Sequence, residues 1–574
     1  MKGIGASPGI AISKAFVIKH EEIKINTEKT EDLQSQLLKI NDALESSRKQ
    51  INAVMKKATM ELGEEEAKIF GAHLMVLDDP EYIGQITELI KNEKITADNA
   101  IKQITDQFIS IFESMDDVYL KERAADIKDV GGRILKNVLG IKSKNLNEIS
   151  EDVIIIAYDL TPSDTAQMNK EKVLGFATDI GGRTSHTAIM ARSLEIPAVL
   201  GLKTITQEVK DGDILIVDGL AGEVMINPSE DILHKYEKKK REYENYIKEL
   251  EELKDLHAET KDGYRIELVG NIGTPNDVKG VLRNGGQGVG LYRTEFLYMD
   301  SDTMPSEEKQ YKAYKEVLEN MGNMPIIIRT LDIGGDKKLP YLKLEEEMNP
   351  FLGLRAVRLC FKEKELFKTQ LRAILKASVY GKALIMFPMI SNIQEVRQAK
   401  AILDECKLEL EEENVKYDKD IQVGIMVEIP SAAIAADIIA KEVDFFSIGT
   451  NDLCQYTLAV DRMNETVSYL YQPFDPAILR LVKNVVDASH KYNKFTGMCG
   501  EMAGEPLATL ILLGLGLDEF SMSASSIPQI KKIIRSVTKE EAEKIASKAL
   551  ELSTAEEVKE MVELELKELS ISII

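Results

Sequence analysis

Eight short apolar runs recur between residues 264 and 574, and they alternate with stretches of helical periodicity. Eight β/α alternations within roughly 310 residues predict a (β/α)8 barrel. An open doubly wound sheet is the alternative, and both architectures place ligands at the carboxyl ends of their strands. The runs cover residues 266–272, 288–292, 326–331, 383–389, 423–427, 445–448, 495–498 and 520–522.

Polar side chains follow these predicted strands at the points where the strands end. The formal net charge of the chain is −23, so any anionic substrate has to be held by a local cluster of Arg residues or a metal that overcomes the global field. The strand ends supply such groups together with amides and one thiol. These residues are Asn271, Arg293, Arg329, Glu428, Asn451, Asp452 and Cys499.

The first half of the chain changes its pattern twice, which indicates a multidomain α/β protein. Strand-like residues open the chain, helical periodicity dominates from about residue 30 to residue 140, and short β runs return between residues 152 and 227. The opening piece is too short to bury a core alone, so we expect it to complete the later α/β unit and the helices to be an insertion. The predicted domains are an α/β domain at 1–21 and 145–228, a helical bundle at 22–144, a linker helix at 229–259 and a barrel at 260–574.

Length and composition limit the classes of protein. A chain of 574 residues with 44% hydrophobic and 29% charged residues is expected to form two to four soluble domains. No apolar run is long enough for membrane insertion, and the first residues lack the features of an export signal. The four cysteines lie far apart, which favours reduced thiols and a cytoplasmic location. The acidic charge disfavours nucleic acid and suits a basic protein partner.

One histidine lies where a phosphate is favoured. The segment GGRTSHTAIMAR (181–192) falls between a predicted strand and a predicted helix, and Thr184 or Ser185 is expected to cap that helix. His186 would then lie beside free backbone N–H groups that favour an approaching phosphate. A neutral imidazole is a competent nucleophile near neutral pH. A buried capping histidine is the structural alternative.

This segment resembles the phosphohistidine signature shared by Enzyme I of the phosphotransferase system, pyruvate phosphate dikinase and phosphoenolpyruvate synthase. Six barrel segments also resemble the phosphoenolpyruvate-utilising family, and the similarity covers essentially the whole chain. The resemblance implies that Thr165 is a hydrogen-bond partner of His186 and that Arg192 contacts the phosphoryl group. The six segments are GVGLYRTEFLYMD (288–300), IIIRTLDIGGDK (326–337), NPFLGLRAVR (349–358), IMVEIPSA (425–432), SIGTNDLCQYTLAVDR (447–462) and GMCGEMAG (497–504).

The resemblance to Enzyme I implies a function and a set of partners. Phosphoenolpyruvate would phosphorylate His186, and the phosphoryl group would pass to the histidine-containing phosphocarrier protein in the first step of sugar uptake. The segment EEEAKIFGAHLMVLDDPEYIGQI (64–86) resembles the helical subdomain that docks this carrier. The family further implies a homodimer formed through the barrel. Because His186 must reach both the barrel and the carrier, we expect swivels near residues 22 and 144 and in the linker helix.

The chemistry of the substrate agrees with the residues at the strand ends. Phosphoenolpyruvate carries a carboxylate and a phosphate, and Arg grips both groups in a bidentate manner. Two carboxylates together with substrate oxygens are the usual way to hold Mg2+, so Glu428 and Asp452 are the predicted metal ligands. Carboxylates simply paired with the arginines are the alternative. The candidate substrate-binding residues are Arg293, Arg329, Arg355, Asn451, Asp452 and Arg462, with Lys337 as a further cation.

A thiol completes the predicted chemistry. Loss of phosphate leaves the enolate of pyruvate, whose carbon must gain a proton, and a thiol of ordinary pKa is mostly protonated at neutral pH. Among the four cysteines only Cys499 lies in a glycine-flanked turn, GMCG, and it matches the proton donor of the family. Cys360, Cys406 and Cys454 are expected to pack as small hydrophobic residues.

Two other functions fit parts of this pattern. Dikinase and synthase relatives need a nucleotide-binding module before the histidine domain, whereas only about 180 residues precede His186 and no G-x-x-x-x-G-K-[ST] string occurs. A catalytically silent regulatory homologue would keep the fold and signal through its bundle. The intact set of His186, Arg293, Glu428 and Cys499, among others, argues against that class.

Overall fold

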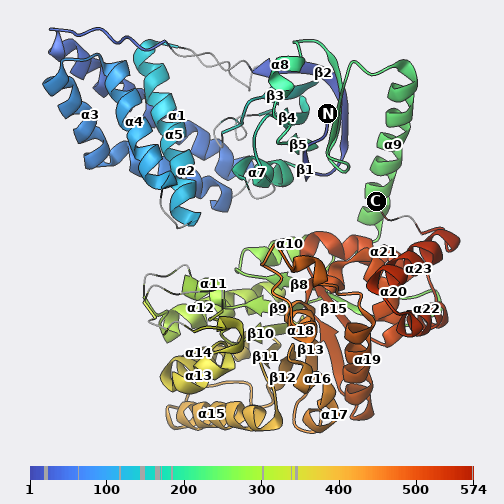
Figure 1. The fold of residues 1–574 in the computed structure, drawn as a ribbon. Coiled ribbons are helices and arrows are strands. Elements are labelled where there is room, and N and C mark those ends of the chain that lie inside the picture. Colours follow the sequence, from blue (N-terminus) through green and yellow to red (C-terminus); the bar gives the residue numbers. More distant parts are fainter. Residues whose placement is uncertain are drawn as a thin grey trace. The chain divides into compact units, whose positions relative to one another are not determined.

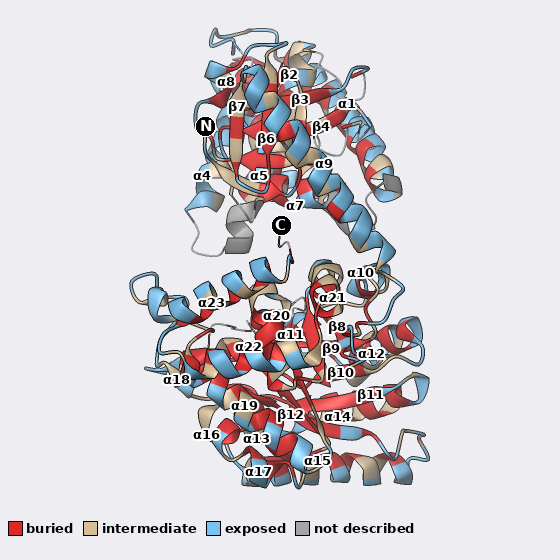
Figure 2. Cartoon of the chain, turned by 90° about the vertical axis from the view of Figure 1, so that its right-hand side faces the viewer, coloured by how far each residue is buried: buried red, intermediate tan, exposed pale blue. Residues whose placement is uncertain are grey.

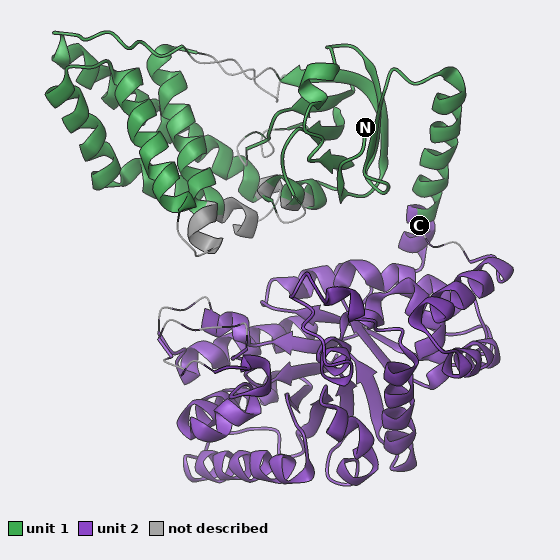
Figure 3. Ribbon diagram, in the orientation of Figure 1, with its two compact units in different colours: residues 1–246 green, residues 247–574 purple. Residues whose placement is uncertain are grey.

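The computed structural model divides the chain into two compact units, residues 1–246 and 247–574 (Figure 3). It describes residues 1–18, 24–61, 64–114, 118–141, 149–161, 164, 168–169, 171–182, 185–299, 301, 303–335, 337, 339, 341–342, 345, 347–571 and 573. No helix among these residues is both long and apolar enough to cross a membrane.

The second unit is built on a closed barrel of eight parallel strands, which confirms the predicted barrel (Figure 1). Around the barrel the order is β10-β11-β12-β13-β14-β15-β8-β9, so neighbours in the sequence are neighbours in space and β8 closes the ring against β15. The strands are β8 (Glu267–Ile272), β9 (Val289–Arg293), β10 (Ile326–Arg329), β11 (Ala383–Phe387), β12 (Gln422–Val427), β13 (Phe445–Ile448), β14 (Phe495–Met498) and β15 (Glu519–Met522).

Helices surround this barrel, and the strand residues that face them are buried in one large apolar core (Figure 2). The α-helices are α10 (Asp277–Arg283), α11 (Glu295–Met299), α12 (Glu307–Met321), α13 (Val357–Lys362), α14 (Lys364–Ala377), α15 (Ile393–Glu412), α16 (Pro430–Ile434), α17 (Ala436–Ile439), α18 (Thr450–Thr457), α19 (Pro476–Lys491), α20 (Pro506–Leu515), α21 (Ile527–Arg535), α22 (Lys539–Glu551) and α23 (Ala555–Glu568). Short 3-10 turns lie at η2 (Pro350–Leu352), η3 (Ser378–Tyr380), η4 (Ser468–Leu470), η5 (Glu501–Gly504) and η6 (Ala524–Ser526).

Alternate strand residues point into the barrel, where they form a second and smaller apolar cluster. Phe445 and Phe495 begin neighbouring strands and stack with ring centroids 5.1 Å apart. Cys499 belongs to the same interior cluster. Because Phe445 and Phe495 lie at the amino ends of their strands, they form a floor inside the barrel, and the opposite end remains for polar groups.

The first unit contains a seven-stranded mixed sheet in the order β1-β5-β4-β3-β2-β6-β7. Strand β2 pairs in parallel with β3 and antiparallel with β6, so the N-terminal strands complete a sheet whose other members follow residue 150. The insertion of the helices into this α/β domain is therefore confirmed. The elements are β1 (Ile4–Ser7), β2 (Ile10–Ile18), β3 (Val153–Ala157), β4 (Val173–Thr178), α7 (His186–Leu194), β5 (Ala198–Leu200), α8 (Ile205–Glu208), β6 (Ile214–Asp218) and β7 (Glu223–Ile226).

In the part of residues 24–141 that the structure describes, five helices form the inserted bundle and enclose their own apolar core. Met190 of α7 is part of that core, so the helix that begins at His186 packs directly against the bundle. The bundle helices are α1 (Leu33–Glu61), α2 (Glu64–Asp78), α3 (Pro80–Glu93), α4 (Ala97–Glu113) and α5 (Val118–Leu139).

Helix α9 (Glu230–Glu252) is shorter than the predicted linker at 229–259 and less solvated than expected. Tyr236 packs in an apolar cluster with Ile10 and Ile216 of the sheet, and Lys239 forms an ion pair of 2.6 Å with Asp218. One face of α9 therefore belongs to the first unit, and the division between the units falls inside this helix, after residue 246.

Candidate active site

His186 is the first residue of α7. The sequence predicts this position near the start of a helix. The side chain of Ser185 caps this helix by accepting a hydrogen bond of 3.3 Å from the backbone N–H of Ala188. The predicted capping role is thus confirmed for Ser185. Thr184, Thr165 and the imidazole of His186 lie outside the described parts of the chain, so the predicted pair of Thr165 and His186 stays a prediction.

Contacts on three sides fix α7. The hydroxyl of Thr187 donates to the carbonyl of Leu160 at 2.9 Å, and Met190 packs into the core of the bundle. Arg192 donates through Nη1 to the carbonyl of Ala6 on β1 at 3.2 Å. The start of α7 is therefore held at the junction of the sheet and the bundle, and the N-terminus of a helix is a favourable position for an anion.

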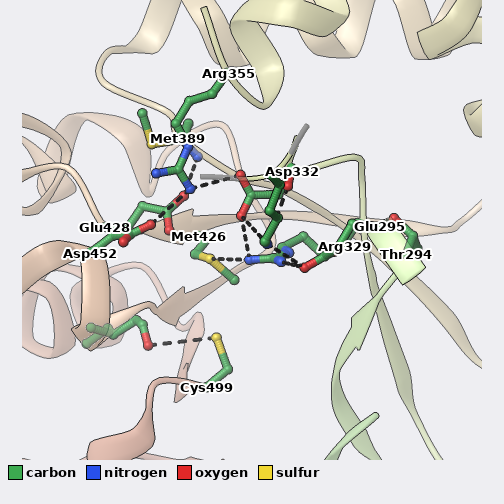
Figure 4. Close-up of polar contacts among 12 residues, drawn as sticks. Thr294, Glu295, Arg329, Asp332, Arg355, Met389, Met426, Glu428, Asp452 and Cys499 are labelled. Carbon is green, nitrogen blue, oxygen red and sulfur yellow. Dashed lines mark hydrogen bonds and ion pairs between the residues drawn. The ribbon is translucent and has the colours of Figure 1, made fainter. Parts of the chain in front are cut away.

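Arg329 ends strand β10 and lies in a buried ion cluster (Figure 4). Its Nη2 lies 2.6 Å from Oε1 of Glu295, and its Nη1 lies 3.1 Å from Oδ2 of Asp332. Lys337 lies 2.8 Å from the same Glu295 oxygen and 3.9 Å from Asp332. Two carboxylates thus fix one guanidinium and one ammonium at the carboxyl end of the barrel.

Arg355 joins this cluster from the segment that precedes α13. Its Nη2 lies 3.0 Å from Oδ1 of Asp332 and 3.1 Å from Oδ2 of Asp452 (Figure 4). Its Nη1 donates to the hydroxyl of Tyr456 at 3.2 Å. A Cβ on Gly334, which has a φ of +113°, would lie 2.5 Å from the Cβ of Arg355, so the loop can approach the arginine only with glycine at this position.

The charges in this cluster stabilise one another. Burial opposes the ionisation of Asp332, but Arg329 and Arg355 outweigh it and hold the pKa of that carboxyl well below its usual range. Burial likewise opposes the charge on Arg329, whereas Glu295 and Asp332 raise the pKa of its guanidinium. Asp332 and Arg329 therefore stay ionised at neutral pH although both side chains are almost completely buried.

Glu428 and Asp452 follow β12 and β13, and both carboxylates are buried. Burial and the charge of Asp452 raise the pKa of Glu428 to about 8, against the opposing effect of Arg355. Glu428 accepts a hydrogen bond of 2.5 Å from the backbone N–H of Met389. A divalent cation between the two carboxylates would relieve their repulsion, so the donor set fits such an ion.

The described residues contain no cluster of three or more His, Cys, Asp or Glu side chains arranged as metal ligands. Glu428 and Asp452 are the carboxylates that the described residues would offer a metal at this place, and substrate oxygens and water would complete the coordination, as is usual for a hard divalent cation. The alternative to a metal site was a carboxylate paired with an arginine. Asp452 forms such an ion pair with Arg355.

Cys499 follows β14 and lies inside the barrel with 4% of its surface exposed. Its thiol lies 3.8 Å from the carbonyl of Ile448 (Figure 4). Burial raises the pKa of this thiol to about 11, against the lowering effects of Ser447 and Arg329. The thiol is thus fully protonated at neutral pH, as a proton donor requires. The other three cysteines are free and buried, as predicted.

The remaining predicted residues lie outside the ion cluster. Arg293 ends β9 and is half-buried, and its charge acts on the thiol of Cys499. Asn451 exchanges hydrogen bonds with Glu501, at 3.2 Å to its side chain and 3.1 Å from its backbone N–H. The side chain of Arg462 interacts with Tyr471. The structure therefore brings Arg329, Arg355 and Asp452 together directly.

Sequence reasoning missed the carboxylates that hold the arginines. Glu295 and Asp332 both lie in segments that resemble the family, two residues after Arg293 and three after Arg329. Their closeness in sequence to arginines at strand ends could have indicated that they pair with these arginines, because a buried guanidinium needs an acidic partner. Tyr456, which accepts from Arg355 and donates to the carbonyl of Phe351 at 2.5 Å, carried no such signal.

Family models match three successive parts of the chain. Residues 2–123 match the N-terminal region of PEP-utilising enzymes, residues 149–222 match their mobile domain, and residues 247–539 match their PEP-binding domain.

Curated relatives match over nearly the full length. A phosphoenolpyruvate-protein phosphotransferase from Staphylococcus aureus is 57% identical over 563 residues, which cover 98% of each chain. Proteins of the same name from Staphylococcus carnosus and Listeria innocua are 55% and 56% identical, again over 98% of each chain. A solution structure titled Enzyme I (nEIt) is 54% identical, with a TM-score of 0.39, and covers 42% of this chain and 99% of its own.

Proposed function

The chain belongs to the phosphoenolpyruvate-protein phosphotransferase family, and on this premise we propose that phosphoenolpyruvate phosphorylates it on His186. The observation that supports the site most strongly is the convergence of Arg329, Arg355 and Asp452 in one buried cluster at the carboxyl ends of the barrel strands. Such an array of fixed cations suits a small substrate that carries both a phosphate and a carboxylate.

The proposed reaction has two steps, phosphoryl transfer and then protonation of the enolate. A ring nitrogen of His186 attacks phosphorus, so that an N–P bond forms while the P–O bond to the enol oxygen breaks and leaves its electron pair on that oxygen. The thiol of Cys499 then gives its proton to the methylene carbon, which yields pyruvate and a thiolate. Mg2+ held by Glu428 and Asp452 would polarise the phosphate and stabilise the charge of the leaving enolate.

Several cationic side chains are proposed to bind the substrate together. We assign the phosphate and carboxylate of the substrate to Arg293, Arg329, Arg355 and Arg462, with Asn451 as an amide donor. Glu295 and Asp332 hold two of these guanidinium groups in fixed orientations, so little reorganisation is needed when the substrate arrives. Lys337 adds a further positive charge beside Glu295.

The acceptor of the phosphoryl group is, in this proposal, the histidine-containing phosphocarrier protein, docked on the bundle at 22–144 of a cytoplasmic homodimer. The mobile α/β domain at 1–21 and 145–228 would move between the carrier and the barrel at 260–574. The resemblance of residues 64–86 to the carrier-docking helices supports this partner. Pull-down of a histidine-bearing partner of roughly 90 residues, the size of one small domain, would test it.

Incubation with labelled phosphoenolpyruvate and Mg2+ tests the activity. We expect an acid-labile, base-stable label on the wild type and none on His186→Ala, whereas Cys499→Ala should take up label but release pyruvate slowly. Absence of label from the wild type, or its retention on His186→Ala, contradicts the proposal.

The metal site needs a test of its own. Glu428→Gln removes one of the two proposed carboxylate ligands and should raise the Mg2+ concentration needed for half-maximal labelling at least tenfold. Binding of Mn2+ in place of Mg2+, followed by electron paramagnetic resonance, gives a readout that does not depend on activity. Unchanged Mn2+ affinity in Glu428→Gln would place the metal elsewhere.

A further inference from the structure

Tyr456 contacts the ion cluster of the barrel, yet the proposed reaction gives its hydroxyl no role. It lies in α18, four residues after Asp452, and residues four apart lie on the same face of an α-helix. Both side chains reach Arg355. Oδ2 of Asp452 lies 3.1 Å from Nη2 of the arginine, and the hydroxyl of Tyr456 accepts a hydrogen bond of 3.2 Å from Nη1. One turn of α18 therefore contacts both terminal nitrogens of the guanidinium.

The hydroxyl of Tyr456 also fixes the turn η2, which precedes Arg355. It donates to the carbonyl of Phe351 at 2.5 Å, and Sδ of Met389 lies 3.8 Å from it. The ring centroid of Phe351 lies 5.7 Å from the guanidinium carbon of Arg355, within the range of a cation–π contact. The hydroxyl therefore holds Arg355 directly and also holds the residue whose ring packs against it.

Arg355 depends on this hydroxyl more than Arg329 does. Arg329 pairs with two carboxylates that are not proposed metal ligands. Arg355 pairs with Asp332 at 3.0 Å and with Asp452, which is a proposed metal ligand (Figure 4). A carboxylate attracts a guanidinium less strongly when it also binds a cation. The hydrogen bond to Tyr456 is a contact of Arg355 that metal binding would leave intact.

The phenol of Tyr456 suits this role because it stays neutral. Burial raises its pKa to about 12, against the lowering effect of Arg355. A neutral hydroxyl has one proton to donate and lone pairs to accept with, which matches its contacts with Phe351 and Arg355. Because it carries no charge, it orients the arginine without offsetting the positive charge that an anionic substrate requires.

We propose, on the basis of the function proposed above, that Tyr456 is a positioning residue that keeps Arg355 directed at phosphoenolpyruvate while Asp452 coordinates the metal. The terminal nitrogens of Arg355 are held by its neighbours, whereas its buried Nε has no hydrogen-bond partner among the described residues. A buried donor without a partner points to a missing acceptor, and an oxygen of the substrate supplies one. Tyr456 acts on the substrate through Arg355.

Calorimetric titration of the His186→Ala chain, which cannot consume phosphoenolpyruvate, measures binding without turnover. Tyr456→Phe, added to this chain, removes the hydroxyl and keeps the ring. With Mg2+ we expect the Kd of phosphoenolpyruvate to rise about tenfold, because a hydrogen bond to a charged group is lost. Without a divalent cation the rise should be no more than about threefold, because Asp452 then still orients Arg355.

A double-mutant cycle with Arg355→Lys separates this positioning role from general support of the fold. Because Tyr456 acts through Arg355, Tyr456→Phe should change the Kd by less than twofold in a chain that already carries Arg355→Lys. Tyr311→Phe is the matched control. It removes a hydroxyl that donates to Tyr380 at 3.1 Å, away from the ion cluster, and should leave the Kd within twofold.

Three results would overturn the proposal. They are an unchanged Kd in Tyr456→Phe, an equal loss of affinity with and without Mg2+, and a full tenfold loss in the chain that carries Arg355→Lys. A His186→Ala chain that does not bind phosphoenolpyruvate at all would instead overturn the function on which the proposal rests.

Discussion

At the scale of single residues, the site consists of charges that are buried because they are paired. Arg329 contacts two carboxylates, and Asp332 contacts both Arg329 and Arg355. Removing one member of such a cluster leaves its partners buried and uncompensated, which costs far more than the loss of a surface ion pair. The residue that bridges two arginines should therefore matter most for the stability of the barrel.

The substitution Asp332→Asn tests this inference. It should lower the free energy of unfolding by about 3–5 kcal/mol, because it leaves two buried guanidinium groups short of a counter-charge. Urea unfolding followed by circular dichroism measures the effect, since the chain has no Trp. Asp437→Asn on the exposed side of α17 is the control and should change stability by no more than about 0.5 kcal/mol.

The same variant has a predicted pH dependence. The pKa of Asp332 is lowered in the folded state. Its contribution to the free energy of unfolding is therefore fully present above the pKa that an aspartate has in the unfolded chain. That contribution is lost as the pH falls from there through the lowered pKa of the folded state. The gap in stability between wild type and Asp332→Asn should therefore narrow in acid. A gap that is constant between pH 7 and pH 3 would contradict an ionic cause.

Glu519 gives the opposite dependence. Its pKa is raised from 4.5 to about 8 in the folded state. The contribution of the protonated side chain to the free energy of unfolding is therefore complete below pH 4.5 and is lost as the pH rises through 8. A tenfold difference in acidity between the folded and unfolded states corresponds to about 1.4 kcal/mol. Glu519→Gln should thus be more stable than wild type at pH 8.5 and close to it at pH 4.5, as measured by urea unfolding. Equal stability at both pH values would contradict the raised pKa.

The sequence predicts the outline of this site but not its internal pairing. Arg329, Glu428, Asp452 and Cys499 were predictable because each lies at or near the end of an apolar run, and the ends of parallel strands meet at one end of the barrel. Which carboxylate contacts which guanidinium depends on loop paths such as the one that brings Arg355 to Asp332, and local patterns contain no such information. The strained φ of +51° at Ala356, next to Arg355, reflects this long-range constraint.

At the scale of elements, apolar runs predict strands well because every barrel strand is covered by helices on one side and filled on the other. The predicted runs at 445–448 and 495–498 agree with β13 and β14 to the residue. The last run was placed at 520–522, whereas β15 begins at Glu519. The discrepancy arises because a charged residue before an apolar run is typical of a loop. Glu519 nevertheless belongs to the strand, and its side chain points inward and is buried.

Helix packing in the bundle yields a prediction with a built-in control. Gly131 and Gly132 are neighbours in α5, but a Cβ on Gly131 would lie 2.4 Å from Cγ2 of Thr105, whereas a Cβ on Gly132 would meet nothing within 4 Å. Thr105 cannot easily move, because its hydroxyl shares a hydrogen bond of 2.6 Å with Tyr82. The two helices α4 and α5 therefore approach each other at Gly131.

We expect Gly131→Ala to destabilise the bundle by about 1–3 kcal/mol through overpacking. Gly132→Ala should stabilise it by up to about 1 kcal/mol, because alanine has the higher helix propensity. Hydrogen–deuterium exchange of the amides in α4 and α5 reports on this subdomain without interference from the barrel. Slower exchange in both variants would show that neither glycine is a packing contact.

At the scale of the whole molecule, the proposed nucleophile and the proposed substrate site belong to different compact units. His186 lies in residues 1–246, and the ion cluster of Arg329 and Arg355 lies in residues 247–574. The two units are joined through α9, one face of which packs on the sheet through Tyr236. The connection therefore works as a tether that raises the effective concentration of one unit near the other.

Mixing two defective chains measures the effect of this tether. Arg355→Ala keeps His186 but should charge poorly from its own barrel, and His186→Ala keeps an intact barrel but has no acceptor. At about 1 μM of each chain, labelling in the mixture should be slower than in the wild type by a factor on the order of 10²–10³, because a tether gives effective concentrations near millimolar. The rate should also rise in proportion to the concentration of the His186→Ala chain. A mixture that labels as fast as the wild type at every concentration would mean that charging does not depend on the covalent connection through α9.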